Sequence, residues 1–198
     1  MELLFDHVDT PVGPVRLVCD PDGMLRAVDW VDHDERYQRQ LERHYGIGRE
    51  DLRPAKDPFG LCSVLRRYMS GEIHAIDDLP VRTVGTDFQT EVWRELRRIP
   101  AGTTISYGQL AERIRRPKAV RAVGLANGSN PIGIVVPCHR VIGANGKLTG
   151  FGGGLHRKEW LLRHEAEWTS PLFGSRRGRD EKTAETADGL PGSSPTLS

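Results

Sequence analysis

The sequence predicts an α+β fold, in which residues 1–83 form a small antiparallel sheet covered by helices and residues 84–168 form a mostly helical unit with a helix-turn-helix. Three observations predict it. Strand-like runs separated by turn residues fill the first 30 positions, apolar residues recur at helical spacing between about 85 and 168, and apolar residues nearly vanish after Thr169. We expect residues 169–198 to be a disordered tail, because they can bury little apolar surface.

The N-terminal unit begins with three strand-like runs, LLFDHV, VRLVC and LRAVDWV. The turn sequences TPVGP at 10–14 and DPDG at 20–23 separate them, which predicts an antiparallel meander. Apolar residues about four apart predict helices over 34–45 and 61–69 that cover this sheet. The run LPV at 79–81 is typical of a last edge strand that leads out of the unit.

The second unit opens with an apolar helical stripe from Phe88 to Ile99. Ser106, with glutamine three residues later, has the capping-box pattern of a second helix, and Pro117 is suited to begin a third helix that runs to about residue 127. This pair is typical of a helix-turn-helix, although such pairs also occur as plain packing units. A buried strand over 132–136, a glycine-rich loop and a last helix over 156–168 follow.

Charge is distributed unevenly along a chain whose formal net charge is only +1. Residues 1–83 hold 11 basic and 16 acidic side chains (−5), residues 84–165 hold 13 and 6 (+7), and residues 166–198 hold 4 and 5 (−1). The basic middle segment indicates either a polyanionic partner or a solvated basic face without one.

Several classes of protein are disfavoured by what the sequence lacks. No run approaches about 18 apolar residues, and the N-terminus has no signal-peptide pattern, so we expect a cytoplasmic protein without a membrane partner. The cysteines Cys19, Cys62 and Cys138 are too few and too scattered for a disulfide framework or a four-thiolate zinc site. His7 and Cys19 are isolated, and we expect no metal and no cofactor.

Cys138 follows a proline and stands next to His139 and Arg140. Cations and oriented amides lower the pKa of a thiol, so this position favours a thiolate, although a lone cysteine is more often a small core residue. In the last helix, Lys158 and Glu165 lie beside the inward-facing stripe. Glu165 would either fix the tautomer of His139 and support a Cys–His relay or form an ordinary intrahelical or surface pair.

Three strings together carry a family resemblance: VPCHRVI at 136–142, SYGQLA at 106–111 and PKAVRAVG at 117–124. With them the chain resembles the O6-alkylguanine-DNA alkyltransferases, also called methylated-DNA–protein-cysteine methyltransferases. The resemblance is strong from about 86 to 165 and weak before it. It implies a ribonuclease-H-like N-terminal sheet and DNA repair by one irreversible transfer of an alkyl group from O6 of guanine, and also from O4 of thymine, in duplex DNA.

The resemblance also implies the catalytic roles. Cys138 would take the alkyl group, His139 would act as its base through a bridging water, and Glu165 would orient His139. Tyr107 would donate a hydrogen bond to N3 of the flipped base and help to neutralise the leaving guanine. Since nothing is placed to hydrolyse the thioether, each molecule would react once.

Further residues are implied to hold the substrate and the DNA. The carbonyls of Cys138 and Val141 would accept from the exocyclic amine of guanine, Asn130 would brace the active-site strand, and Lys158 would lie near the thiol. Arg121 would fill the stack where the base has left. The DNA-binding face would comprise Lys118, Ala119, Arg121 and Gly124.

The chain departs from the family pattern at Phe151, where many members have a tyrosine whose hydroxyl contacts O6. Only a backbone N–H, that of Gly152, would remain for this contact. We expect a monomer in solution. Two alternatives stay open: a module that binds alkylated bases without transferring the group, and a helix-turn-helix regulator with an incidental cysteine.

Overall fold

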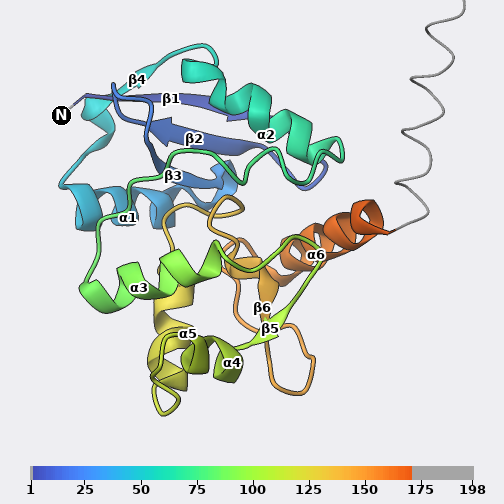
Figure 1. The fold of residues 1–198 in the computed structure, drawn as a ribbon. Coiled ribbons are helices and arrows are strands. Elements are labelled where there is room, and N and C mark those ends of the chain that lie inside the picture. Colours follow the sequence, from blue (N-terminus) through green and yellow to red (C-terminus); the bar gives the residue numbers. More distant parts are fainter. Residues whose placement is uncertain (1, 171–198) are drawn as a thin grey trace, which may run out of the picture.

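The computed structural model describes residues 2–170 and has an α+β architecture, with a small sheet at one end and most of the helices at the other (Figure 1). The α+β expectation is confirmed. All but two residues of the expected tail lie outside the described residues, and Thr169 is the last residue of the final helix.

The sheet contains four strands in the order β3-β2-β1-β4. The first three, β1 (Leu3–Val8), β2 (Val15–Cys19) and β3 (Leu25–Trp30), form the predicted antiparallel meander. The short β4 (Leu52–Pro54) pairs parallel with β1, so the sheet is mixed. The expected edge strand at 79–81 is reduced to an isolated bridge between Val81 and Leu25, because Pro80 has no N–H to donate.

Two helices cover the sheet as predicted, one on each face (Figure 1). Helix α1 (Asp34–Tyr45) buries Tyr37 and Leu41 against one face, and α2 (Leu61–Met69) packs on the other. Both helices have the predicted bounds. In α1 the polar side chains lie on the side away from the sheet.

The second half begins with α3 (Asp87–Leu96), α4 (Tyr107–Arg113) and α5 (Val120–Gly128). Ser106 caps α4 in a capping box with Gln109, as predicted, and α4 packs against α5. The prediction that Pro117 begins the third helix is wrong. A turn closed by the hydrogen bond from the Ala119 N–H to the Arg116 carbonyl precedes α5, which begins only at Val120.

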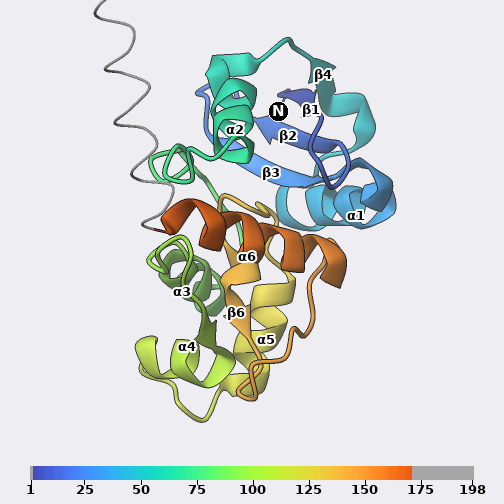
Figure 2. The ribbon, with the colours of Figure 1, turned by 90° about the vertical axis from the view of Figure 1, so that its right-hand side faces the viewer.

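The final helix α6 (Leu155–Thr169) crosses between the sheet and the lower helices (Figure 2). A two-stranded parallel sheet, β5 (Ile105–Ser106) with β6 (Val141–Ile142), lies beneath it. The remaining helical turns are 3-10 in type and are η1 (Val31–His33), η2 (Arg49–Asp51), η3 (Pro58–Gly60) and η4 (Cys138–Arg140).

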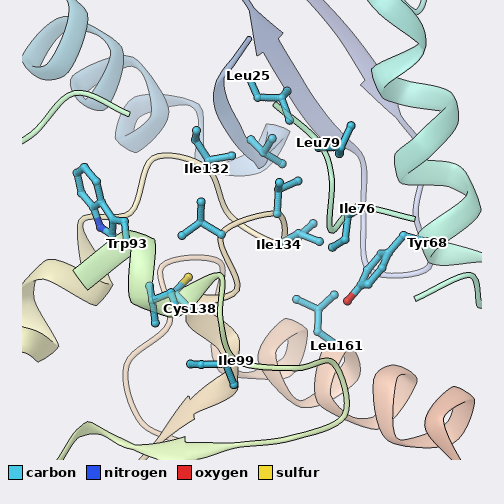
Figure 3. Close-up of a cluster of buried hydrophobic side chains, with 14 of the residues drawn as sticks. Leu25, Tyr68, Ile76, Leu79, Trp93, Ile99, Ile132, Ile134, Cys138 and Leu161 are labelled. Carbon is cyan, nitrogen blue, oxygen red and sulfur yellow. The ribbon is translucent and has the colours of Figure 1, made fainter. Parts of the chain in front are cut away.

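One hydrophobic core joins the two halves (Figure 3). Leu25 and Tyr68 enter it from the sheet side, and Ile134 and Leu161 enter it from the other half. Cys138 lies in the same cluster (Figure 3). The sheet therefore helps to hold the position of the segment that carries this cysteine.

Candidate active site

The segment before Cys138 is a buried turn, so the expected strand over 132–136 is wrong. The Val136 N–H donates to the Ile132 carbonyl at 2.9 Å, and Ile134 has a φ of 68°. Asn130 holds this turn closed, because its Nδ2 donates to the Val136 carbonyl at 2.7 Å and its Oδ1 accepts from the Ile132 N–H at 3.0 Å. The run of apolar residues predicted burial correctly but could not distinguish a strand from a turn.

Cys138 is only 7% exposed and lines a small pocket beside α5 and the loop 150–153. The pocket has a volume of about 20 Å³, room for about one water molecule. Typical ligand pockets measure about 300–1,000 Å³. A ligand of that size can therefore reach the thiol only after part of the pocket wall moves.

Burial raises the pKa of the Cys138 thiol, although the Lys158 ammonium lowers it. The expectation that this position favours a resting thiolate is thus contradicted, because Cys138 lies inside the core rather than at its edge. A protonated thiol needs a base to become nucleophilic. The residue next to it can supply one.

His139 is completely buried and its Nε2 lies 2.9 Å from Oε1 of Glu165. Its Nδ1 has no hydrogen-bond partner among residues 2–170. Burial and the nearby Arg140 and Lys158 cations lower the pKa of His139 despite the Glu165 charge. A neutral imidazole that donates from Nε2 to the carboxylate has Nδ1 free to accept a proton.

Glu165 is the centre of a buried hydrogen-bond network. It accepts from the Tyr68 hydroxyl at 2.8 Å and from the Gly102 N–H at 3.1 Å, in addition to its contact with His139. Arg140 donates to it through Nε at 3.0 Å and Nη2 at 2.8 Å. Burial alone would raise the pKa of Glu165, but His139 and Arg140 outweigh it and hold this pKa well below its usual range.

Lys158 is fully buried, and its Nζ donates to the carbonyls of Val141 at 2.6 Å and Thr149 at 2.8 Å. Burial lowers the pKa of Lys158 to about 8. This ammonium ties Val141, three residues after Cys138, to Thr149, which directly precedes the loop 150–153. One lone pair of the Val141 carbonyl is thereby used, which leaves the other for a ligand.

Tyr107 and Phe151 lie at the edge of the site. Tyr107 is partly exposed, and its hydroxyl donates to the Thr149 carbonyl at 3.4 Å. Burial raises the pKa of Tyr107, so the phenol keeps its proton at neutral pH. The Phe151 ring stands edge-on to Trp30, with ring centroids 5.7 Å apart, and to His139 at 6.5 Å.

The residues expected to contact DNA lie on α5 and just before it. Arg121 and Lys118 are exposed, and Ala119 and Gly124 are partly exposed. A Cβ at Gly124 would make only ordinary contact, 3.9 Å from the Tyr107 ring, and one at Gly128 would meet no atom within 4 Å. These glycines are therefore not required for packing between helices.

Two charged residues of the first half, Asp29 and Arg36, line the pocket. The sequence did not predict them. Asp29 is 3% exposed and pairs with Arg36, while its Oδ2 has no partner in the part of the chain that the structure describes. Burial raises the pKa of Asp29. The Arg36 guanidinium lies so close to Gly152 that a Cβ there would overlap it. No local pattern indicated this pair, because Asp29 lies within strand β3 and Arg36 lies on a polar helix face.

Among the described residues, no group of three or more His, Cys, Asp or Glu side chains is arranged to hold a metal ion. No helix within residues 2–170 is both long and apolar enough to span a membrane.

Known proteins similar to this chain belong to one family. The family described as 6-O-methylguanine DNA methyltransferase, DNA binding domain, matches residues 87–167. The methylated-DNA–protein-cysteine methyltransferase of Shigella flexneri is 53% identical over 165 residues, which are 83% of this chain and 96% of the relative. The protein of that name from Mycobacterium tuberculosis strain H37Rv is 46% identical over 160 residues, 80% of this chain and 89% of the relative.

A solved structure is also similar. The crystal structure of Mycobacterium tuberculosis OGT in complex with DNA superposes with a TM-score of 0.70 at 39% identity, and the match covers 85% of this chain and 96% of that one.

Proposed function

The chain belongs to the methylated-DNA–protein-cysteine methyltransferase family, and from this premise we propose that Cys138 is the residue to which it transfers an alkyl group from O6 of guanine. The protein repairs DNA by alkyl transfer to cysteine. The observation that supports the assignment is that Cys138 lines the pocket while the next residue, His139, contacts Glu165 through Nε2 at 2.9 Å. Cys19 and Cys62 lie in the N-terminal half, where burial raises their pKa values to about 11 and about 12.

The transfer is a direct displacement at the alkyl carbon. The Cys138 proton passes through a bridging water to the free Nδ1 of His139, and the thiolate sulfur forms a bond to the alkyl carbon. The bond between that carbon and O6 breaks, and its electron pair stays on guanine. Tyr107 donates to N3 of the leaving base and so offsets part of this charge. Glu165 stabilises the imidazolium that forms on His139.

Guanine is selected by backbone groups. The carbonyls of Cys138 and Val141 accept from its exocyclic amine, which adenine cannot offer in the same position. Asn130 closes the turn that precedes Cys138, and Lys158 donates a hydrogen bond to the Val141 carbonyl. Together they hold these two carbonyls in place. The Gly152 N–H faces O6, Arg36 lies against this glycine, and Phe151 of the same loop packs edge-on against Trp30. Base entry opens the loop 150–153, since the resting pocket holds only about one water molecule.

The partner is duplex DNA that carries O6-alkylguanine, and the protein acts as a monomer. Helices α4 and α5 form the helix-turn-helix of a unit that spans 84–168, and residues 1–83 form a second unit that supports the pocket. Arg121 replaces the flipped guanine in the stack, together with contacts from Lys118, Ala119 and Gly124. The exposed side chains of this face and its open glycines support the assignment.

Duplex DNA carrying a radiolabelled methyl group on O6 of one guanine tests the proposal. Wild-type protein should become labelled to one equivalent at most, because a thioether is stable and no described residue is placed to hydrolyse it. Cys138→Ser should remain unlabelled yet bind the duplex, because a hydroxyl with a far higher pKa cannot replace the thiol. Cys62→Ser is the matched control and should be labelled like wild type. Retained transfer by Cys138→Ser would refute the assignment.

A further inference from the structure

A second hollow adjoins the Cys138 pocket: an open groove of about 700 Å³ between α1 and α5. Arg36 and Gly128 line both the groove and the pocket. Helices α1 and α2 cover opposite faces of the sheet (Figure 1), and the groove lies beside α1. The groove therefore continues the site along the outside of the protein.

The α5 wall of this groove belongs to the face assigned above to DNA. Gly124, Leu125 and Gly128 line the groove, and they follow Arg121 at i+3, i+4 and i+7. Leu125 is 71% exposed, which is unusual for a large apolar side chain. A duplex that lies on this face of α5 must also lie next to α1.

The α1 wall presents a stripe of arginines. Arg36, Arg39 and Arg43 are at i, i+3 and i+7 and line the groove, while Tyr37 and Leu41 face the sheet. Arg39 has a 71% exposed side chain, and its one ion pair within residues 2–170 is a long contact of 3.6 Å to the exposed Glu35. Exposed ion pairs of this kind contribute little to stability, so Arg39 is free to exchange its partner.

Arg43 is exposed and has no ion-pair partner within the described part of the chain. Glu42 is the one acidic residue among those that line the groove. Local charge here is thus opposite to that of the segment as a whole, since residues 1–83 carry a net −5. Residue counts along the sequence conceal a basic strip that the helix gathers on one face.

We propose that Arg39 and Arg43 bind backbone phosphates of the same duplex that α5 contacts, so that the N-terminal unit forms part of the DNA-binding surface. This inference rests on the function proposed above. Four residues of α-helix rise about 6 Å, and successive nucleotides of one strand rise about 3.4 Å along the duplex axis. Two arginines one turn apart therefore match phosphates one or two nucleotides apart. A planar guanidinium binds phosphate oxygens in bidentate fashion.

The test compares two double variants that lose the same charge. Arg39→Ala/Arg43→Ala removes the proposed contacts, and Arg66→Ala/Arg67→Ala removes two exposed arginines of α2, on the far side of the sheet. Each lost phosphate contact should lower the slope of log K against log salt by about 0.9, or about 8-fold in affinity near 0.1 M salt. We expect a slope change of about 1.8 for the α1 variant and little change for the α2 variant.

A further variant tests the sign of the effect. Glu42→Gln removes the acidic residue from the groove and should tighten DNA binding. Equal slopes for wild type and the α1 variant, equal losses for the α1 and α2 variants, or weaker binding by Glu42→Gln would each overturn the inference.

The free O6-alkylguanine base separates this inference from the proposed function. It needs no duplex contact, so the α1 variant should react with it at the wild-type rate, and this rate also confirms that the pocket is folded. A wild-type protein that takes no label from alkylated DNA would refute the proposed function itself. Normal labelling with an unchanged salt slope in the α1 variant would refute only the role of α1.

Discussion

Replacing Glu165 with glutamine perturbs the buried network that positions His139. The carboxylate is fully buried and accepts hydrogen bonds from four residues, which are Tyr68, Gly102, His139 and Arg140. A glutamine amide turns one accepting oxygen into a donor that faces other donors, and it leaves the buried Arg140 without its counter-charge. Losing one partner of a buried ion pair costs about 3–5 kcal/mol.

This cost sets the size of the expected effect. For a chain of this length each kcal/mol lowers the melting temperature by about 2–4 °C, so Glu165→Gln should lower it by about 6–20 °C. Circular dichroism during thermal and urea unfolding measures both quantities. Glu167→Gln, on the same helix but exposed, is the matched control and should change stability by less than about 0.5 kcal/mol.

A double-mutant cycle with Arg140→Met isolates the pair. Once Arg140 is uncharged, removing the Glu165 charge no longer strands a buried cation, so the double variant should cost clearly less than the sum of the single variants. Strict additivity, or a Glu165→Gln protein as stable as wild type, would refute the view that this carboxylate is the electrostatic centre of the site.

Three further predictions concern pH, the loop and the DNA face. The melting temperature should fall as pH drops below about 6.5, because the unfolded state protonates His139 at its ordinary pKa while the folded state does not. It should fall further below about pH 4.5, where only the unfolded state protonates Glu165. His139→Gln should flatten the first part of this profile, and an unchanged profile would contradict the assigned directions. Phe151→Tyr should raise the transfer rate about 2- to 12-fold if the restored hydroxyl donates to O6, a hydrogen bond worth roughly 0.5–1.5 kcal/mol. A slower protein would show that the added hydroxyl disturbs the packing of this ring against Trp30 more than it helps the reaction. Arg121→Ala should slow the reaction with duplex DNA but not with the free alkylguanine base. Arg121→Lys should restore the duplex rate only in part, because an ammonium cannot stack on bases. Equal losses of rate on both substrates would assign Arg121 a structural role.

Local patterns were sufficient for most of the helices and strands. The helices over 34–45 and 61–69 have the predicted bounds because their apolar residues recur at one spacing and their ends are marked by turn residues. The predictions failed where contacts between residues far apart in the sequence determine the local structure. The run at 132–136 is buried whether it is extended or turned, and the pairing of β4 with β1 depends on residues about 50 positions apart.

The candidate site shows the same division. The contact between His139 and Glu165 followed from helical spacing and from the family resemblance. The contributions of Asp29, Arg36 and Tyr68 did not, because they reach the site from the other half of the chain through tertiary packing. The pKa of Cys138 was misjudged for a related reason. Its charged neighbours are visible in the sequence, whereas the burial that outweighs them is a property of the fold.

The most direct test of the central claim is to locate the transferred group by peptide mass spectrometry after a single round of reaction with methylated duplex DNA. We expect one methyl group in place of the thiol hydrogen of Cys138, in no more than one equivalent, with Cys19 and Cys62 unmodified. A methyl group on either of those cysteines, or release of methyl groups beyond one per molecule, would contradict this claim.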